Sequence, residues 1–396
     1  MRLPQAVCFY AWRYKKLQAD ARNRDYVVRC GRRLRKVLFD SGLFKVFWSS
    51  YQIIAATGDN LGVRFPRPYA DVQRFIAKLT QISFLSLVPS SCLLGESVGF
   101  LHELHVAVWA PIVLSVVVLV LSHLLQRSKK KWKALPSKGV GGILFIFSII
   151  APSTSLKLFQ YQVCTKLADG SWWLTADLSL QCPWYAGVPS NSAYVTVAVG
   201  WLVYPIGFPL LLFYLLCGRA EARNALLADK ASTVPGMRKY SYIYEVYQPY
   251  VAPWFEGFDM LRRMVLCGLI AFMGPPDAGS EYYVAVRAAA GMVLSLLVAT
   301  FYREVMPYRR SNLNTMMSIG GYCILLTYAM AFIIDVEPWG EMNEDQLSIV
   351  GWLLVLLALP IASATGVRML IELKQQLSLE RHRQKLDTMA QLHVEK

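Results

Sequence analysis

The sequence has little charge for its length. Of its 396 residues, only 17% are Asp, Glu, Lys or Arg, whereas 55% are hydrophobic. Acidic residues are scarcer than basic ones, 26 against 41, so the formal net charge is +15. Soluble domains of this size are usually more polar, because they must cover a core with a hydrated surface. The composition therefore excludes an ordinary soluble protein and leaves the basic residues to be explained.

The sequence also lacks the motifs of common catalytic sites. It has no phosphate-binding Walker loop, and neither a GxSxG nor a GxGxxG segment lies in the strand-turn-helix context that these motifs require. His102, Glu103 and His105 do not provide the i, i+4 histidine pair of a helical zinc site. We therefore predict that the chain is not an enzyme and binds no cofactor or catalytic metal.

Seven apolar stretches are long enough to cross a bilayer. A membrane-spanning helix needs about 20 apolar residues, and a helix satisfies its own backbone hydrogen bonds inside the hydrocarbon region. The predicted spans cover residues 101–125, 140–159, 194–217, 258–274, 282–302, 313–336 and 349–371. Residues 44–57 form a shorter and more polar eighth candidate. Residues 72–94 carry Arg74 and Lys78 and favour a helix at the outer interface, or one that re-enters the membrane.

Basic residues mark alternate connections between these stretches. Residues 1–41, 126–138, 218–252, 303–312 and 372–396 hold 11, 6, 5, 3 and 5 Lys and Arg residues, whereas the intervening connections hold only Lys166. Because Lys and Arg stay on the cytosolic side, the alternation predicts two cytosolic termini and an even number of spans. We therefore predict an all-α, multi-pass bundle of about eight transmembrane helices, in the plasma membrane or an endomembrane.

The same count assigns a place to the net charge. The basic residues lie between apolar stretches and not on a folded face, so nucleic acid is not an expected partner. The bundle would cover residues 43–371, between a basic cytosolic segment (1–42) and a cytosolic helical tail (372–396). Beside an anionic leaflet the basic loops act as topological determinants that contact anionic lipids. A regulatory phosphoinositide site is the competing hypothesis, and its residues would be Lys129, Lys130, Lys131 and Lys133.

Two of the eight cysteines bracket a predicted outer loop. Cys164 and Cys182 enclose CTKLADGSWWLTADLSLQC, in which the Asp-Gly pair favours a turn. We predict a small extracellular β-hairpin closed by a disulfide between them. Cys92 is also placed outside, so an arrangement that links it to one of the other two is the alternative.

The run PWFEGFDMLRRM places charge at the start of the fourth strong span. Glu256, Asp259 and Arg263 lie at positions i, i+3 and i+7 of one helix face, with Arg262 beside them, which favours intrahelical pairing. One interpretation is an ion-paired helix start whose side chains reach the cytosol. The other is a gating element that couples the preceding loop to the membrane helices.

Lys157 is a further charged residue at membrane depth. It follows Pro152-Ser153-Thr154-Ser155, where the proline frees a backbone carbonyl that the hydroxyl groups can satisfy. A kinked helix end and a gating element are the two interpretations. Pro205 and Gly207 in the third span also suit a helix that bends.

Several motifs occur in an order that resembles a known family. They are APSTS at Ala151, the loop from Cys164 to Cys182, YPIGFPLLLFYLL at Tyr204, Tyr247-Gln248-Pro249, WFEGFDMLRRMVLCGL at Trp254, and Met306-Pro307-Tyr308 with Ser311-Asn312. Over roughly residues 43–371 the chain resembles the TRP-like, polycystin-like C-terminal membrane module of large protist and algal surface proteins that have cysteine-rich ectodomains.

The resemblance implies a cation-channel subunit that mediates ion transport, with cations and further copies of the chain as partners. An outer acidic group would concentrate cations, and it consists of Asp335, Glu337, Glu341, Glu344 and Asp345. The sequence departs from the TRP pattern, because the connection over residues 335–346 is too short for a pore helix and a selectivity filter. It also shows no ankyrin repeats and no ladder of arginines, so no pore residues are assigned.

Two other functions fit the same sequence. The chain could be a non-conducting anchor or sensor module of a truncated cell-surface protein, with the stapled loop as its contact surface and the basic loops and tail as its cytosolic output. A lipid or solute transporter is the third hypothesis. An inverted repeat would favour it, and none is visible in the sequence.

Overall fold

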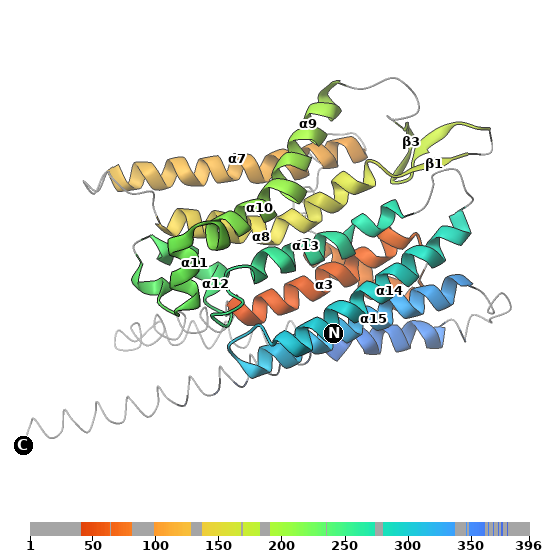
Figure 1. The fold of residues 1–396 in the computed structure, drawn as a ribbon. Coiled ribbons are helices and arrows are strands. Elements are labelled where there is room, and N and C mark those ends of the chain that lie inside the picture. The colour runs from red at the N-terminus through yellow and green to blue at the C-terminus, as the bar shows by residue number, and fades with distance from the viewer. Residues whose placement is uncertain are drawn as a thin grey trace, which may run out of the picture. The chain divides into compact units, whose positions relative to one another are not determined.

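A computed structural model describes residues 41–63, 65–80, 99–127, 137–167, 169–182, 191–234, 236–273, 280–336 and 348–360, and the single positions 346, 363, 367, 371, 374 and 378. The chain divides into two units, of which one is Lys45–Ile361 and the other combines Met1–Phe44 with Ala362–Lys396. Nearly all described residues belong to the first unit (Figure 1). The predicted basic segment and cytosolic tail lie almost entirely outside the described residues.

In the part of the chain that the structure describes, five helices are long and apolar enough to cross a membrane. They are Phe100–Leu124, Gly139–Gln160, Ala193–Gly218, Val284–Val305 and Ser311–Ile334. They coincide with five of the seven strong predicted spans, which are therefore confirmed as long apolar helices. Helices of this length and composition are those of a membrane-embedded protein.

The elements follow one another along the chain as helices with one small sheet. The helices that hold the five spans are α7 (Phe100–Arg127), α8 (Ser137–Gln160), α9 (Asn191–Trp201) with α10 (Phe208–Phe213), α14 (Ser280–Val305) and α15 (Ser311–Val336). The other described α-helices are α3 (Ser41–Leu61), α4 (Arg67–Thr80), α11 (Ala220–Leu227), α12 (Ser241–Tyr244), α13 (Phe255–Cys267) and an apolar helix over Ser348–Pro360. Short 3₁₀ turns cover Ala231–Thr233, Met237–Tyr240 and Leu269–Phe272.

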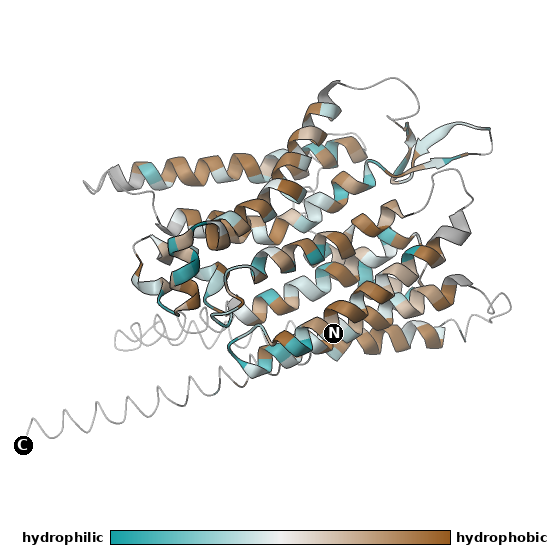
Figure 2. Ribbon diagram, viewed as in Figure 1, coloured by the Kyte–Doolittle hydropathy of each residue, from teal (hydrophilic) through white to brown (hydrophobic). Residues whose placement is uncertain are grey.

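The long helices consist largely of hydrophobic residues (Figure 2), and α7 and α14 expose many of them. Only 22% of the most apolar stretch of α7 is buried, and its exposed side chains are Val113, Leu114, Val116, Val117, Val120, Leu121 and Leu124. On α14, Val293, Leu296 and Leu297 are exposed in the same way. Apolar surface of this extent is unfavourable in water and favourable against lipid tails.

Helix α3 has the opposite distribution, with its polar side chains buried inside the bundle. The set comprises Lys45, Ser49, Ser50, Gln52, Thr57 and Asn60. The helix has 21 residues, which at about 1.5 Å per residue is about 30 Å, the thickness of a hydrocarbon core. The weak eighth candidate over residues 44–57 is thus a helix of sufficient length. Its membrane crossing stays a prediction.

The predicted span over residues 258–274 is not one continuous helix. Helix α13 ends at Cys267 after 13 residues, and a 3₁₀ turn follows over Leu269–Phe272. The break falls at Gly268, where an added Cβ would lie 2.0 Å from the Phe159 ring of α8. The close approach of this ring requires glycine at the position where the helix breaks, although hydropathy predicts continuation.

Two other predicted helices are described only in part. Helix α4 covers the first part of the interfacial helix predicted over residues 72–94, and Arg74 pairs with Asp71 on its exposed face. The span predicted over residues 349–371 is described as an apolar helix up to Pro360. The count of eight spans therefore stays a prediction.

The loop between Cys164 and Cys182 folds as a three-stranded antiparallel sheet. Its strands are β1 (Cys164–Lys166), β2 (Trp172–Leu174) and β3 (Asp177–Gln181), in the order β1-β2-β3. A disulfide joins Cys164 to Cys182, with the two Cα atoms 5.9 Å apart. The predicted disulfide is confirmed, and the predicted hairpin corresponds to β1 and β2, to which β3 adds a third strand that was not predicted. The alternative partner, Cys92, lies outside the described residues.

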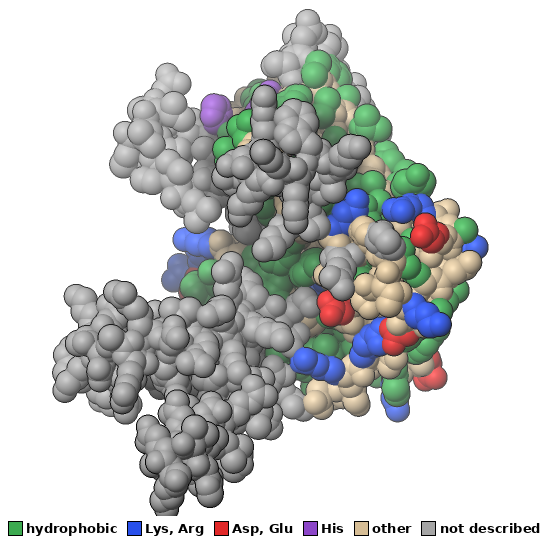
Figure 3. Space-filling view, turned by 90° about the vertical axis from the view of Figure 1, so that its left-hand side faces the viewer, with side chains coloured by type: hydrophobic (Ala, Val, Ile, Leu, Met, Phe, Trp, Pro, Cys, Tyr) green, Lys and Arg blue, Asp and Glu red, His purple; other side chains and the backbone are tan. Residues whose placement is uncertain are grey.

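The hairpin and the short helices α11 and α12 lie at opposite ends of the bundle (Figure 1). Figure 3 shows the end with α11 and α12, where Lys and Arg side chains gather among a few Asp and Glu. The long apolar helices run between the two ends. The bundle therefore has two polar ends separated by an apolar belt, as membrane embedding requires.

Candidate functional site

Four charged residues of α13 are buried in the bundle. The exposed fractions of Glu256, Asp259, Arg262 and Arg263 are 1%, 4%, 5% and 5%. Trp254 and Phe255 at the start of the helix pack on neighbouring aromatic rings, which places the charged face inward. The interpretation as a helix start whose side chains reach the cytosol is therefore wrong for these residues.

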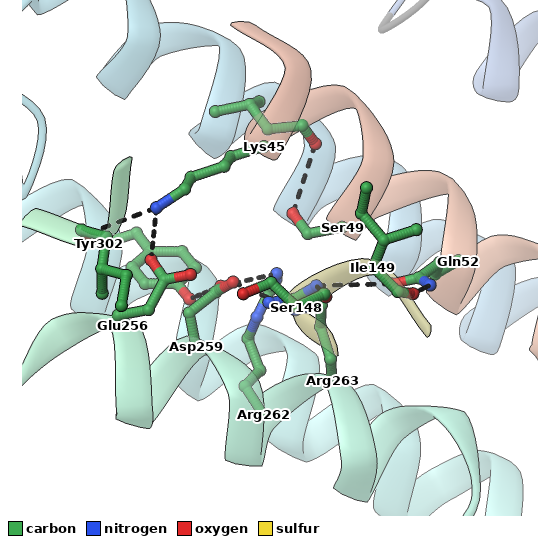
Figure 4. A network of polar contacts seen from close by, with 12 residues as sticks. Lys45, Ser49, Gln52, Ser148, Ile149, Glu256, Asp259, Arg262, Arg263 and Tyr302 are labelled. Carbon is green, nitrogen blue, oxygen red and sulfur yellow. Dashed lines mark hydrogen bonds and ion pairs between the residues drawn. The ribbon is translucent and has the colours of Figure 1, made fainter. Parts of the chain in front are cut away.

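Glu256 pairs with a lysine from a distant part of the chain (Figure 4). Lys45 Nζ of α3 lies 2.7 Å from Glu256 Oε2, and the Tyr247 hydroxyl donates to the same oxygen at 2.7 Å. Lys45 also donates to the carbonyl of Ile243 and lies 4.5 Å from the centre of the Tyr242 ring. The expected pairing of Glu256 within its own helix is replaced by a contact between helices.

Asp259 binds both arginines of its own helix. Its carboxylate oxygens lie 2.9 Å from Arg262 and 3.2 Å from Arg263, at the i+3 and i+4 positions. The Tyr302 hydroxyl of α14 donates to Asp259 at 2.8 Å, and the Arg262 guanidinium lies over the Tyr302 ring. The predicted intrahelical pairing is thus present for Asp259, and it is tied to α14 through Tyr302.

Arg263 satisfies a backbone carbonyl that a proline has freed. Pro152 of α8 has no N–H, so the Ser148 carbonyl four residues earlier lacks its helical donor. Arg263 Nη1 donates to that carbonyl at 3.0 Å and approaches Gln52 Oε1 at 3.4 Å. Gln52 Nε2 in turn donates to the neighbouring Ile149 carbonyl at 2.7 Å. Side chains from α13 and α3 therefore donate to the backbone carbonyls before Pro152 in α8, whereas the sequence predicted that neighbouring hydroxyl groups would do so.

A hydroxyl group does play this part at a second proline. Pro111 of α7 leaves the carbonyl of Ala107 without its helical donor, and Thr154 Oγ1 donates to it at 3.3 Å. In a membrane, where water cannot complete these bonds, such contacts fix one helix against another. The APSTS segment thus provides a proline to one contact and a hydroxyl group to another.

The charge network, defined as Lys45, Glu256, Asp259, Arg262 and Arg263, contains three basic and two acidic side chains. Arg262 Nε has no hydrogen-bond partner among the described residues, and Arg262 Nη2 faces Asp259 without hydrogen-bond alignment. Buried charge without full compensation is costly, and this cost is greatest in a low-dielectric interior. The network is therefore a poor choice for stability alone.

No protein-family model matches the chain, and neither a curated protein nor a solved structure matches it. The network must be interpreted from its own geometry. Within the described ranges, no group of His, Cys, Asp and Glu side chains could hold a metal ion. What the arrangement offers is a set of alternative ion pairs and hydrogen bonds joining α3, α8, α13 and α14.

A bridge between two loops lies directly beside the network. Gln248 donates its N–H to the carbonyl of Pro307 at 2.8 Å, and Arg309 donates its N–H to the carbonyl of Val246 at 3.0 Å. The Tyr308 ring packs 5.2 Å from that of Tyr247, whose hydroxyl reaches Glu256. This loop bridge, Val246–Gln248 with Pro307–Arg309, connects the ends of two segments to the charge network.

An ion pair on the protein surface, between Arg309 and Asp229, contacts the loop bridge. Arg309 Nη1 donates to Asp229 Oδ2 at 3.0 Å, and Arg309 Nε donates to the carbonyl of Tyr247 at 2.8 Å. The hydrogen bonds from Arg309 lower the pKa of Asp229 below its ordinary value. The bonded form of this carboxyl is the ionised one.

The other predicted site residues do not join the network. Lys157 Nζ lies 2.8 Å from Glu103 Oε2, in an ion pair between α8 and α7 near the hairpin. The acidic group over residues 337–345 lies outside the described residues. Asp335 lies in the last turn of α15, and its side chain is outside the described part of the structure.

The segment with Pro205 and Gly207 contains two widened turns. π-Helical segments cover Leu202–Gly207 and Tyr214–Gly218, before and after α10. An added Cβ at Gly207 would lie 2.2 Å from the carbonyl oxygen of Leu202. π-Helical turns insert a residue into the helix and often occur at functional positions. They fit the predicted bending of this span.

Sequence reasoning missed the partners of the α13 charges. Lys45 and Gln52 lie in the more polar candidate span over residues 44–57, and neither they nor Tyr302 were predicted as partners of these charges. A signal was present, because a lysine and a glutamine seven residues apart lie on one face of an otherwise apolar helix. Such a face predicts buried polar partners elsewhere in the bundle.

Proposed function

We propose that the chain is a TRP-like, multi-pass membrane protein that serves as a cation-channel subunit. In this proposal the charge network couples the loop bridge to helices α3, α8 and α14. A change in the loops would exchange ion pairs within the network and shift the helices that it joins. Ions would cross between copies of the chain or along a path through the bundle.

The observation that supports the proposal most is the burial of five charged side chains in a membrane-type bundle. An inert anchor needs only apolar contacts, and replacing buried ion pairs by apolar side chains is often neutral or stabilising. Charged residues at membrane depth usually mark conduction, coupling or sensing. The connection from Glu256 through Tyr247 to the loop bridge gives this network an input at one end of the bundle.

The proposed orientation places the loop bridge, α11 and α12 in the cytosol, and the hairpin outside. Both termini would be cytosolic, which requires an even number of spans. Ala176 in the hairpin and Ser232 beside α11 are exposed. Each can be replaced by cysteine and labelled with a membrane-impermeant maleimide on intact cells. Labelling of Ala176→Cys alone is expected, and equal labelling of both contradicts the orientation.

Current through reconstituted protein is the direct test of conduction. We expect cation current in planar bilayers, reduced when Glu337, Glu341, Glu344 and Asp345 are replaced by their amides. Tyr247→Phe removes the hydroxyl group that joins the loop bridge to Glu256 and should change the open probability with little change in single-channel conductance. Tyr250→Phe, whose exposed hydroxyl donates to the Val305 carbonyl, is the matched control.

A non-conducting sensor is the second hypothesis. The disulfide-closed hairpin supports it, because Leu167 and Leu178 are exposed there and could contact an outer partner. Folded, correctly oriented protein that gives no current under any tested stimulus would favour the sensor. If the protein conducts cations but Tyr247→Phe has the open probability of the wild type, the channel proposal stands and the coupling role of the network is rejected.

A further inference from the structure

A cavity with polar lining residues lies at the hairpin end of the bundle, away from the charge network. Its volume is about 350 Å³. Its walls come from the ends of α3, α7, α8 and α14, from the turn after α13, and from the hairpin. Small-molecule sites in proteins occupy about 300–1,000 Å³, so this cavity matches a small ligand.

The cavity carries opposite charges that do not neutralise one another. Asp59, Lys157 and Arg287 all line it. Lys157 is already paired with Glu103 at 2.8 Å. Asp59 makes no ion pair with any residue in the described part of the chain, and Arg287 makes none either. Among the described residues, Asp59 and Arg287 are thus the acidic and the basic side chain of the cavity that form no ion pair.

Arg287 is held in a position to bind an anionic group. Its Nε donates to the Met273 carbonyl at 2.9 Å, which fixes the plane of the guanidinium. The two terminal amino groups are not used by that bond. An anchored guanidinium can bind a carboxylate with two parallel hydrogen bonds.

Asp59 is suited to a cationic group. Its side chain is exposed and lines the cavity, so its carboxylate is accessible to a ligand. A bound ammonium group would stabilise the ionised carboxylate. Asn60, beside it, is 2% exposed, and its Oδ1 is a buried acceptor with no hydrogen-bond partner among the described residues.

The rest of the wall is apolar. Leu156, Phe159, Val163 and Ala271 line the cavity, and all but Val163 are buried. A cavity lined by a carboxyl, a guanidinium and apolar side chains matches a molecule with two opposite charges and a hydrocarbon side chain. A purely anionic or purely cationic ligand would leave either Asp59 or Arg287 without a partner.

We propose that this cavity binds a small zwitterion, an apolar α-amino acid, with its carboxylate on Arg287, its ammonium group on Asp59 and its side chain along the apolar wall at Val163. The site lies at the opposite end of the bundle from the loop bridge. Its occupancy does not depend on the proposed channel activity, and binding can be measured without any current. Phosphatidylethanolamine carries the same ammonium and an anionic phosphate, so a lipid headgroup is the other source of this chemistry.

Binding is tested with the full chain in nanodiscs of phosphatidylcholine alone. Equilibrium dialysis with radiolabelled leucine and phenylalanine should give saturable binding. 3-Methylbutylamine, which lacks the carboxylate of leucine, and 4-methylpentanoate, which lacks its ammonium group, should not compete. Asp59→Asn and Arg287→Gln should each weaken binding by at least about tenfold, since each removes a charge-assisted contact.

Matched controls separate this site from general charge effects. Arg303→Gln removes an exposed arginine of α14 and Asp71→Asn an exposed aspartate of α4, and both should bind as the wild type does. Equal thermal unfolding of all four variants shows that they are folded. The proposal is overturned if the wild type shows no saturable amino-acid binding, or if Asp59→Asn and Arg287→Gln bind normally. A second outcome overturns it in favour of a lipid: the protein binds no amino acid but retains phosphatidylethanolamine from nanodiscs that contain it, and Asp59→Asn and Arg287→Gln abolish that retention.

Discussion

Replacing Lys45 by methionine should destabilise the bundle far more than its position near a helix start suggests. The lysine is 8% exposed and its partner Glu256 is 1% exposed, with 2.7 Å between Nζ and Oε2. Methionine keeps most of the side-chain volume and removes the charge. Glu256 is then buried with only the Tyr247 hydroxyl as a partner.

The expected size follows from the asymmetry of buried ion pairs. Removing one partner leaves an uncompensated buried charge and costs about 3–5 kcal/mol, whereas replacing both partners is often nearly neutral. We therefore expect Lys45→Met to lower the free energy of unfolding by about 3 kcal/mol or more. The double variant Lys45→Met/Glu256→Gln should recover most of that loss, because glutamine is neutral and still accepts from Tyr247.

The assay is unfolding in mixed detergent micelles, followed by tryptophan fluorescence. Arg74→Met is the matched control, since it breaks a pair whose side chains are 74% and 65% exposed and should cost less than about 1 kcal/mol. The reasoning is refuted if Lys45→Met is as stable as Arg74→Met. It is also refuted if the double variant is no more stable than Lys45→Met alone.

Three further predictions concern the other contacts. Arg263→Met should lower the free energy of unfolding of the wild type by more than that of a Pro152→Ala variant, because the alanine N–H can donate to the Ser148 carbonyl in place of Arg263. Equal losses in the two backgrounds, measured as a thermodynamic cycle, would contradict this. Reduction of Cys164–Cys182, or its replacement by two serines, should expose the hairpin to trypsin at Lys166, because a loop of this length loses roughly 3 kcal/mol of conformational restraint. The Asp229–Arg309 contact stabilises the loop bridge above pH about 3.9, the ordinary pKa of an aspartate, and is lost as the pH falls through the lower pKa of folded Asp229. The protection factors of the Gln248 and Arg309 amides, which are corrected for the intrinsic exchange rate at each pH, should therefore fall below that pH in the wild type and already be low at neutral pH in Asp229→Asn.

The long apolar helices and the stapled hairpin were predictable because their determinants are local. A run of about 20 apolar residues specifies a membrane helix wherever its neighbours lie, and the turn residues between Cys164 and Cys182 bring the two thiols together within one short loop. The five confirmed spans and the disulfide follow from such local patterns. The charges on one face of α13 were also visible, since i, i+3 and i+4 spacing is a property of a single helix.

The environment of those charges was decided by the tertiary structure. Hydropathy ranks α3 as the weakest span, yet its polar residues are among the most buried in the bundle, because an ion pair with Glu256, 211 residues away, compensates Lys45. The requirement for glycine at position 268 likewise comes from the Phe159 ring of another helix. Sequence by itself determined the five long apolar helices and the disulfide between Cys164 and Cys182. Packing decided which polar groups meet, because a polar face on one helix predicts that it has buried partners but does not identify the distant segment that provides them.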